Sequence, residues 1–368
     1  MGGLALVFAA CVGVPCAIFY GLFRHWFFGA LTLVPPLAVF ASTIVFRRFD
    51  LNLALIASLF GTVCALSFGD RLVRGVSVGR HGHALASETC RLVILAVVPV
   101  LTAYALCLSA EVLVLRSWET SAQSVLFFVA GFAAAFGAGW LISFFPFSEQ
   151  FVARANAARE WREQLLEQFF PPMQSRWAFS VAGIALILGT IAAFGIPDTH
   201  IDQAPRIWLC VVIGLAFLAA GFTAIARNWR MAASLTLAAS FNGVLLCWAL
   251  ARRDRFLDPI TVEATLFLAC VPLCLTAACA RGYLREGDDV ASALSIAVRD
   301  AGAAAIALGA MTGWVGVGST AVFLVLSPAL VFSLSSMFAA LLLFPALAVA
   351  IHSLFPHYRT VDEVFGGR

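Results

Sequence analysis

Long apolar runs recur along the whole chain, and they constrain its fold more than any other feature. A helix that crosses a bilayer needs about 20 consecutive, mostly apolar residues. Eleven segments approach that length with few charges: 4–23, 31–46, 51–68, 92–108, 125–145, 179–196, 207–226, 231–251, 262–280, 301–326 and 330–354. They predict an all-α, polytopic membrane protein with about 11 transmembrane helices.

Composition excludes a water-soluble body and a nucleic-acid partner. Of the 368 residues, 62% are hydrophobic and 12% are charged, which leaves too little polar surface to cover a soluble molecule of this size. All 23 basic residues are arginines, and they are scattered over short loops rather than gathered on one face. We therefore expect no nucleic acid among the partners.

The arginines also predict the orientation in the membrane, because positively charged loops stay in the cytoplasm. With the N-terminus outside, sixteen arginines fall on the cytoplasmic side and seven on the other. Residues 252–255 are a local exception, with three arginines on the outer side. The sequence predicts an outside N-terminus and a cytoplasmic C-terminus.

Two stretches, 51–110 and 262–319, share the same order of apolar run, charged cluster and apolar run. Residues 83–110 align with 292–319 without a gap, and three pairs are identical: Ala84 with Ala293, Leu85 with Leu294, and Ala96 with Ala305. Such internal repeats are typical of membrane transporters. We predict two pseudo-repeated bundles, with five spans in residues 1–147 and six in residues 173–354.

Between the two bundles lies one amphipathic segment, 148–172. Its apolar residues recur at helical spacing, and Pro171 and Pro172 end the pattern: Phe151, Ala155, Ala158, Trp161, Leu165 and Phe169. This predicts a helix that lies flat at the cytoplasmic membrane surface, with a soluble connector helix as the alternative. Residues 355–368 would form a short cytoplasmic tail.

Several short motifs carry a resemblance to a known family. They are LNL at 51–53, LSFGDRL at 66–72, RGYLREGD at 281–288, AVRDAG at 297–302 and LFPAL at 343–347. In this order they resemble the permeases of the RND superfamily, and most closely the MMPL-type exporters of lipids and other hydrophobic molecules.

The resemblance implies a place in the bacterial cytoplasmic (inner) membrane and a bundle in which residues 1–147 are similar to a sterol-sensing unit. On this mapping the chain begins at the family's second span and ends after its twelfth. We expect it to lack the first span and the large extracytoplasmic domains.

The resemblance also indicates candidate transport residues. The family's fourth span carries Asp-Tyr where this chain has Ser67 and Phe68, and the tenth span has no carboxylate near Thr276. A proton-coupled transporter needs an ionisable group inside the membrane, and no span has a central acid. The proton-relay candidates are Ser67, Asp70, Thr276 and Asp300, where the two aspartates are either displaced relay groups or ordinary solvated helix ends.

Other polar residues suggest no chemistry. The ten cysteines lie in or beside apolar runs and are interpreted as core residues, and the sequence has no hydrolase, metalloprotease or P-loop motif. We expect no catalytic residue, no metal site and no cofactor. Asn242, in the middle of a span, is expected to make a hydrogen bond to another helix.

Two hypotheses of function follow. The first is an inner-membrane transporter-like protein that handles a lipid or other hydrophobic molecule without the usual proton-relay acids. The alternative is a non-transporting scaffold or partner subunit of a lipid or polyketide export or synthesis system. The expected partners are membrane lipids, a hydrophobic substrate and a separate periplasmic or membrane subunit.

Overall fold

A computed structural model describes the chain over a defined set of residues, most of them helical and the rest in turns or short irregular segments. They are 26–46, 51–80, 82–87, 90–91, 94, 97–98, 100–102, 104–105, 109, 118–169, 175–194, 219, 228–251, 270–271, 273–281, 283–284, 289–299 and 343–355. No strand occurs within these residues. The all-α class is confirmed.

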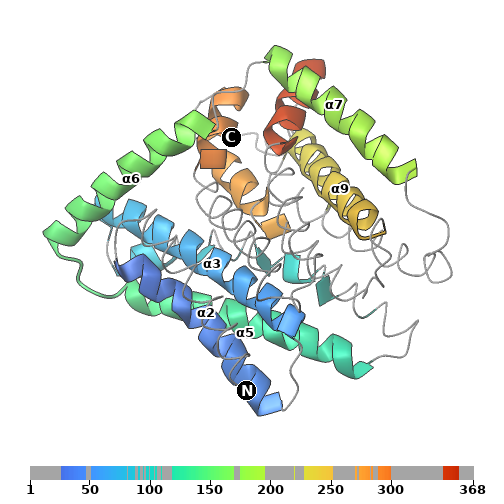
Figure 1. Cartoon of the computed structure of the whole chain (residues 1–368). Coiled ribbons are helices and arrows are strands. Elements are labelled where there is room, and N and C mark those ends of the chain that lie inside the picture. The colour runs from blue at the N-terminus through green and yellow to red at the C-terminus, as the bar shows by residue number, and fades with distance from the viewer. Residues whose placement is uncertain are drawn as a thin grey trace, which may run out of the picture. The chain divides into compact units, whose positions relative to one another are not determined.

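Six long helices form the described part of the chain (Figure 1): α2 (Trp26–Phe46), α3 (Leu51–Ser77), α5 (Trp118–Ile142), α6 (Glu149–Phe169), α7 (Ser175–Phe194) and α9 (Trp229–Ala251). Shorter helices follow at 273–281, Val290–Arg299 and Leu343–Leu354. The predicted spans 31–46, 51–68, 125–145, 179–196 and 231–251 coincide with α2, α3, α5, α7 and α9.

The other predicted spans lie wholly or partly outside the described residues. Among the helices that are described, one stretch of 18 residues, Val125–Ile142 in α5, is long and apolar enough to cross a bilayer by length and composition. The number of spans therefore stays a prediction.

Two compact units divide these helices. Unit 1 contains α2, α3, most of α5 and α6, and unit 2 contains α7, α9 and the shorter helices from residue 270 onward. Because the second unit also takes positions 97–105, its boundaries do not follow chain order. The predicted division at residues 147, 172 and 354 stays a prediction.

In unit 1, glycines allow α2, α3 and α5 to approach closely. A Cβ atom on Gly61 would lie 2.5 Å from the Cβ of Pro35 in α2 and 2.9 Å from the carbonyl oxygen of Gly131 in α5. A Cβ on Gly131 would lie 2.9 Å from the carbonyl oxygen of Ala57 in α3. Small residues at helix contacts are typical of membrane bundles. They let the backbones approach closely, and the resulting van der Waals packing stabilises helix association where the hydrophobic effect does not act between helices.

Aromatic side chains fill the space on either side of this glycine contact. Phe60 of α3 meets Phe128 of α5 edge to face, with ring centroids 5.2 Å apart, and Phe68 meets Phe136 in the same way at 5.7 Å. Such pairs contribute about 0.5–1.5 kcal/mol beyond the area they bury. Alternating glycines and phenylalanines therefore set the register of α3 on α5.

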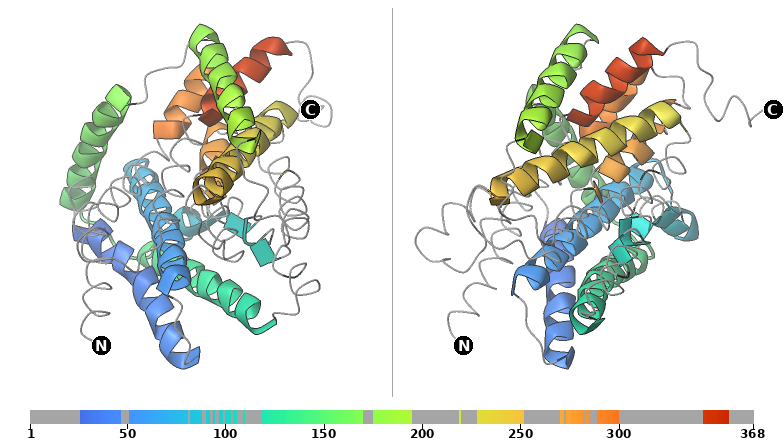
Figure 2. Two further views of the ribbon diagram at one scale, coloured as in Figure 1. Left: turned by 45° about the vertical axis from the view of Figure 1, so that its right-hand side comes forward. Right: turned by 90° about the vertical axis from the view of Figure 1, so that its right-hand side faces the viewer.

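In unit 2, α7 has the side-chain distribution of a helix that faces lipid. The residues it buries are small, namely Ala178, Ala182, Ala185 and Ala192, whereas Trp177, Ile184, Ile187 and Ile191 are each 59–68% exposed. A soluble helix would bury the large side chains and expose polar ones. The helices α7 and α9 lie side by side (Figure 2). The ring of Phe241 from α9 lies against Gly189 of α7, which indicates that the side of α7 with small residues packs on α9.

The amphipathic segment forms the helix α6, within the predicted range 148–172. Ser148 caps its N-terminus, because the Ser148 Oγ accepts a hydrogen bond from the Phe151 amide at 3.2 Å. On its apolar side Val152 and the preceding Phe147 pack against a buried cluster of unit 1, formed by Leu72, Val76 and Leu85. Its exposed residues are mostly polar: Glu149, Gln150, Ala153, Arg154, Ala157, Glu160, Gln164, Glu167 and Gln168.

Candidate functional site

The first pair of candidate residues lies on α3. Ser67 is partly buried, between the fully buried side chains of Leu66 and Phe68. Asp70 lies one turn further along the same helix, and its side chain lies outside the described part of the structure. Ser67 and Asp70 thus lie on one helix, and their role in transport stays a prediction.

The helix α3 continues beyond the predicted span end at residue 68 and stops at Ser77. Its end is a Schellman motif, in which the Arg80 amide donates to the Gly75 carbonyl and the Gly79 amide donates to the Val76 carbonyl, each at 2.9 Å. Gly79 has a φ of 78°, which is the left-handed conformation that this motif requires. The charged cluster therefore extends the helix out of the apolar run.

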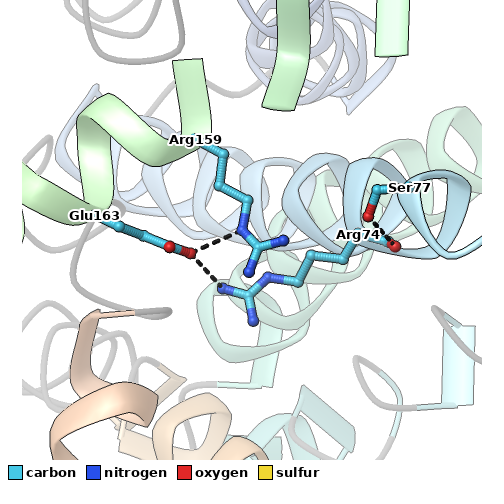
Figure 3. A network of polar contacts seen from close by, with 4 residues as sticks. All are labelled: Arg74, Ser77, Arg159 and Glu163. Atoms are coloured by element: carbon cyan, nitrogen blue, oxygen red, sulfur yellow. Dashed lines mark hydrogen bonds and ion pairs between the residues drawn. The ribbon is translucent and has the colours of Figure 1, made fainter. Parts of the chain in front are cut away.

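This extension carries a network of charges that holds α6 (Figure 3). Within α6, the Arg159 Nε donates to the Glu163 Oε1 at 2.7 Å, and Arg74 of α3 brings a guanidinium nitrogen to 4.0 Å from the same oxygen. The Arg74 side chain is only 12% exposed, whereas Glu163 is 39% exposed. One carboxylate thus links two arginines on two helices.

The second pair of candidate residues belongs to unit 2. Thr276 is fully buried in a helix whose neighbouring residues are also buried, including Leu273, Cys274 and Ala277. Asp300 lies outside the described residues. Ser67 belongs to unit 1 and Thr276 to unit 2, and each is described within its own unit.

Buried polar side chains limit the chemistry available in the described residues. The buried polar and charged set holds hydroxyls, two asparagines and one arginine, with no carboxylate: Thr32, Thr43, Ser58, Thr62, Ser143, Asn228, Arg230, Ser234, Asn242 and Thr276. No group of three or more His, Cys, Asp or Glu side chains with metal-binding geometry occurs there. The described cysteines, which include Cys64 and Cys274, are buried free thiols.

A polar cluster that the sequence analysis missed joins the start of α9 to the last described helix. The Asn228 Oδ1 accepts from the Arg230 amide at 3.0 Å and so caps α9. The Asn228 Nδ2 lies 3.2 Å from the His352 Nε2, and the His352 Nδ1 lies 2.8 Å from the Ala348 carbonyl oxygen. Because a carbonyl only accepts, the Nδ1 of His352 carries the proton and its Nε2 accepts from Asn228.

The cap could have been found in the sequence, since asparagine directly before an apolar run is a strong N-cap signal. Its pairing with His352 could not, because 124 residues separate the two positions.

Asn242 departs from its prediction. It lies on the most buried stripe of α9, with Leu235 and Ala238, and is itself 1% exposed. Its Oδ1 has no hydrogen-bond partner, so the expected hydrogen bond to another helix is wrong for this oxygen. An unsatisfied buried polar atom costs about 1–3 kcal/mol.

The all-helical described residues, with large apolar side chains exposed along α7, define an all-α polytopic membrane protein, and its fold is similar to that of a known membrane protein. The comparison behind this class is with the crystal structure of SecDF, a translocon-associated membrane protein from Thermus thermophilus. The likeness has a TM-score of 0.65 at 10% sequence identity and covers 95% of this chain and 62% of SecDF.

This chain thus spans about 62% of the length of that relative. At such low identity the likeness establishes the fold alone. No family model and no curated protein matches the sequence.

Proposed function

We propose that this chain is a transporter-like protein of the bacterial inner membrane, of the MMPL type, that moves a lipid or other hydrophobic molecule along its helices. Support comes from the RND-like fold and from the motifs at 66–72 and 281–288. The N-terminus lies outside and the C-terminus in the cytoplasm, as the arginine distribution favours. No catalytic step and no cofactor belongs to the proposal.

This proposal rests mainly on the type of side chain at two of the proton-relay candidates, Ser67 and Thr276. Ser67 is partly buried and Thr276 fully buried, and no carboxylate is buried among the described side chains. A hydroxyl does not change its charge near neutral pH, so it cannot convert a proton gradient into helix movement. We therefore propose that movement of the hydrophobic molecule does not depend on a proton gradient.

The experiment places the full chain in lipid vesicles that contain a fluorescent phospholipid. Movement between leaflets is followed by adding an impermeant quencher outside, with and without a pH difference across the membrane. We expect faster movement than in protein-free vesicles, with the same rate in both conditions. Asp70→Asn should leave the rate unchanged, and a rate that depends on the pH difference or on Asp70 would contradict the uncoupled mechanism.

A partner subunit is the second candidate, and the lack of a buried carboxylate among the described side chains favours it too. SecDF is described as translocon-associated, and this chain covers 62% of it. A bundle of this kind could dock a second membrane or periplasmic polypeptide that supplies the remaining parts. If no lipid moves in any vesicle, the transporter proposal fails, and stable co-purification of such a polypeptide from native membranes would support the second candidate.

A further inference from the structure

Asn242 is a buried acceptor in the middle of α9, and no donor to its side-chain oxygen is found in the part of the chain that the structure describes. Its Oδ1 is fully enclosed and has no hydrogen-bond partner. Native structures leave few such atoms unsatisfied, and each one calls for an explanation by a bound molecule or a functional role.

Its neighbours on α9 supply no donor. Met231, Leu235 and Ala238 form the same buried stripe and are apolar. Hydroxyls of the same helix donate to its own backbone instead: the Ser234 Oγ to the Arg230 carbonyl at 2.7 Å, the Thr236 Oγ1 to the Ala232 carbonyl at 2.9 Å, and the Ser240 Oγ to the Thr236 carbonyl at 2.8 Å. These described side chains of α9 leave the Asn242 oxygen without a donor, and a molecule that enters the bundle would supply one.

The surroundings also restrict the chemistry of that molecule. An ammonium group would lose its hydration without gaining an opposite charge, because no carboxylate is buried among the described side chains. A neutral hydroxyl loses less on leaving water and donates one hydrogen bond, which matches one unpartnered oxygen. The rest of the stripe offers only apolar contact.

We propose that Asn242 is the polar contact of a binding site in unit 2 for an apolar molecule with a free hydroxyl, such as a long-chain alcohol or an acylglycerol. The hydroxyl donates to the Asn242 Oδ1, and the apolar body contacts the stripe around it. This inference rests on the proposed function, because it names the substrate class that the transporter-like bundle takes.

The first test compares two probes, 1-hexadecanol and its methyl ether, on the purified full-length protein in detergent. Thermal unfolding at increasing probe concentration gives an apparent affinity for each. We expect the alcohol to bind about tenfold more tightly than the ether, because the ether leaves the oxygen unsatisfied.

Three variants make the test specific. Asn242→Leu removes the acceptor and should abolish the preference for the alcohol, and Asn242→Ala does the same with less added volume. Ser234→Ala is the matched control, since Ser234 is buried on the same helix but its hydroxyl is already bonded to the Arg230 carbonyl. This control should keep the full preference.

Infrared spectroscopy gives a readout independent of binding strength. The protein is labelled with carbon-13 at the asparagine side-chain carbonyl, and the Asn242 band is assigned by its loss in Asn242→Leu. Addition of hexadecanol should move this band to lower wavenumber, as a new hydrogen bond weakens the carbonyl. A band that is already in the bonded position before addition means that a water holds the site, and this overturns the inference.

The outcomes separate this inference from the proposed function. Equal affinity for alcohol and ether, or a preference that persists in Asn242→Leu, overturns the hydroxyl site and leaves lipid movement in vesicles untouched. A preference that depends on Asn242 in a protein that moves no lipid keeps the site and refutes transport.

Discussion

At the scale of single residues, the glycines of α5 show what a sequence does and does not reveal. The sequence indicates a cluster of small residues, among them Gly131, Gly137 and Gly139, which is typical of close helix packing. In the structure Gly131 touches the α3 backbone and Gly139 lies against Phe68, whereas Gly137 has open space around it. Helical spacing could separate these positions, but only the fold identifies the partner of each.

The first prediction uses this difference. Gly131→Ala places a methyl group 2.9 Å from the Ala57 carbonyl oxygen, and backbone atoms cannot move aside cheaply, so we expect a loss of about 1–3 kcal/mol in unfolding free energy. Gly137→Ala is the matched control and should be neutral or stabilising by up to about 1 kcal/mol. Denaturant unfolding in detergent measures both, and equal effects would contradict the glycine contact.

Asn242 also shows which properties of a residue can be predicted from the sequence and which cannot. Its position in the middle of an apolar run could be predicted from the sequence, and so could its burial. The absence of a donor could not, because it depends on which side chains α9 meets and on the Ser234 hydroxyl being already bonded. Whether a buried polar atom has a hydrogen-bond partner depends on how the helices pack in the folded protein.

At the scale of helices, apolar length predicted where α2, α3, α5, α7 and α9 lie but not where each ends. For α3 the apolar run stops at residue 68, whereas the helix ends only at its Schellman motif around Gly79. Charged residues end a span without ending a helix, since arginine is a good helix former. Helix ends follow from capping and spans from hydropathy, and the two signals need not coincide.

The second prediction concerns the attachment of α6 to this extension. Glu163→Gln removes the charge that Arg74 and Arg159 share, but both helices keep their apolar contacts. Because Glu163 is partly exposed, we expect a stability loss below about 1 kcal/mol and faster hydrogen exchange confined to α6. Glu160→Gln, at an exposed position on the same helix, should leave exchange unchanged.

Raised ionic strength provides a further check, since salt screens partly exposed charges. High salt should therefore speed hydrogen exchange of α6 in the parent protein and have little effect in Glu163→Gln. An identical response of the two proteins would argue that apolar packing alone holds this helix.

The third prediction tests the surroundings of α7. Ile187 is 61% exposed, and in a lipid environment Ile187→Arg should cost about 2.5–3.5 kcal/mol of insertion free energy. Ser180→Arg, near the start of the helix, should cost less because its long side chain can reach the membrane surface. The inserted fraction of each variant in isolated membranes measures the difference. Normal insertion of both would mean that this face does not meet hydrocarbon.

At the scale of the whole molecule, hydropathy was sufficient to predict an all-α polytopic protein, and the likeness to SecDF over 95% of the chain agrees with it. The internal repeat has a partial explanation in packing. Leu85 and Leu294, one of its identical pairs, are each 1% exposed. A repeated pattern of buried positions can persist although few residues are identical, because different apolar side chains can fill the same buried position.

The fourth prediction is the orientation. A green fluorescent protein fused to the C-terminus should fluoresce, because it folds in the cytoplasm, whereas alkaline phosphatase at the same place should be inactive. The reverse pattern would contradict the orientation that the arginines indicate and, with it, the cytoplasmic location of α6.

The alanine-lined contact of α7 has a mechanical consequence. Ala178, Ala182 and Ala185 form a strip of small buried side chains on α7, and further along the helix the ring of Phe241 from α9 lies against Gly189. Such a strip opposes separation, which loses dispersion contacts along its full length, more strongly than it opposes lengthwise sliding. We therefore expect lengthwise sliding of α7 along α9 to be easier than separation of the two helices, and the ring of Phe241 at Gly189 to oppose that sliding.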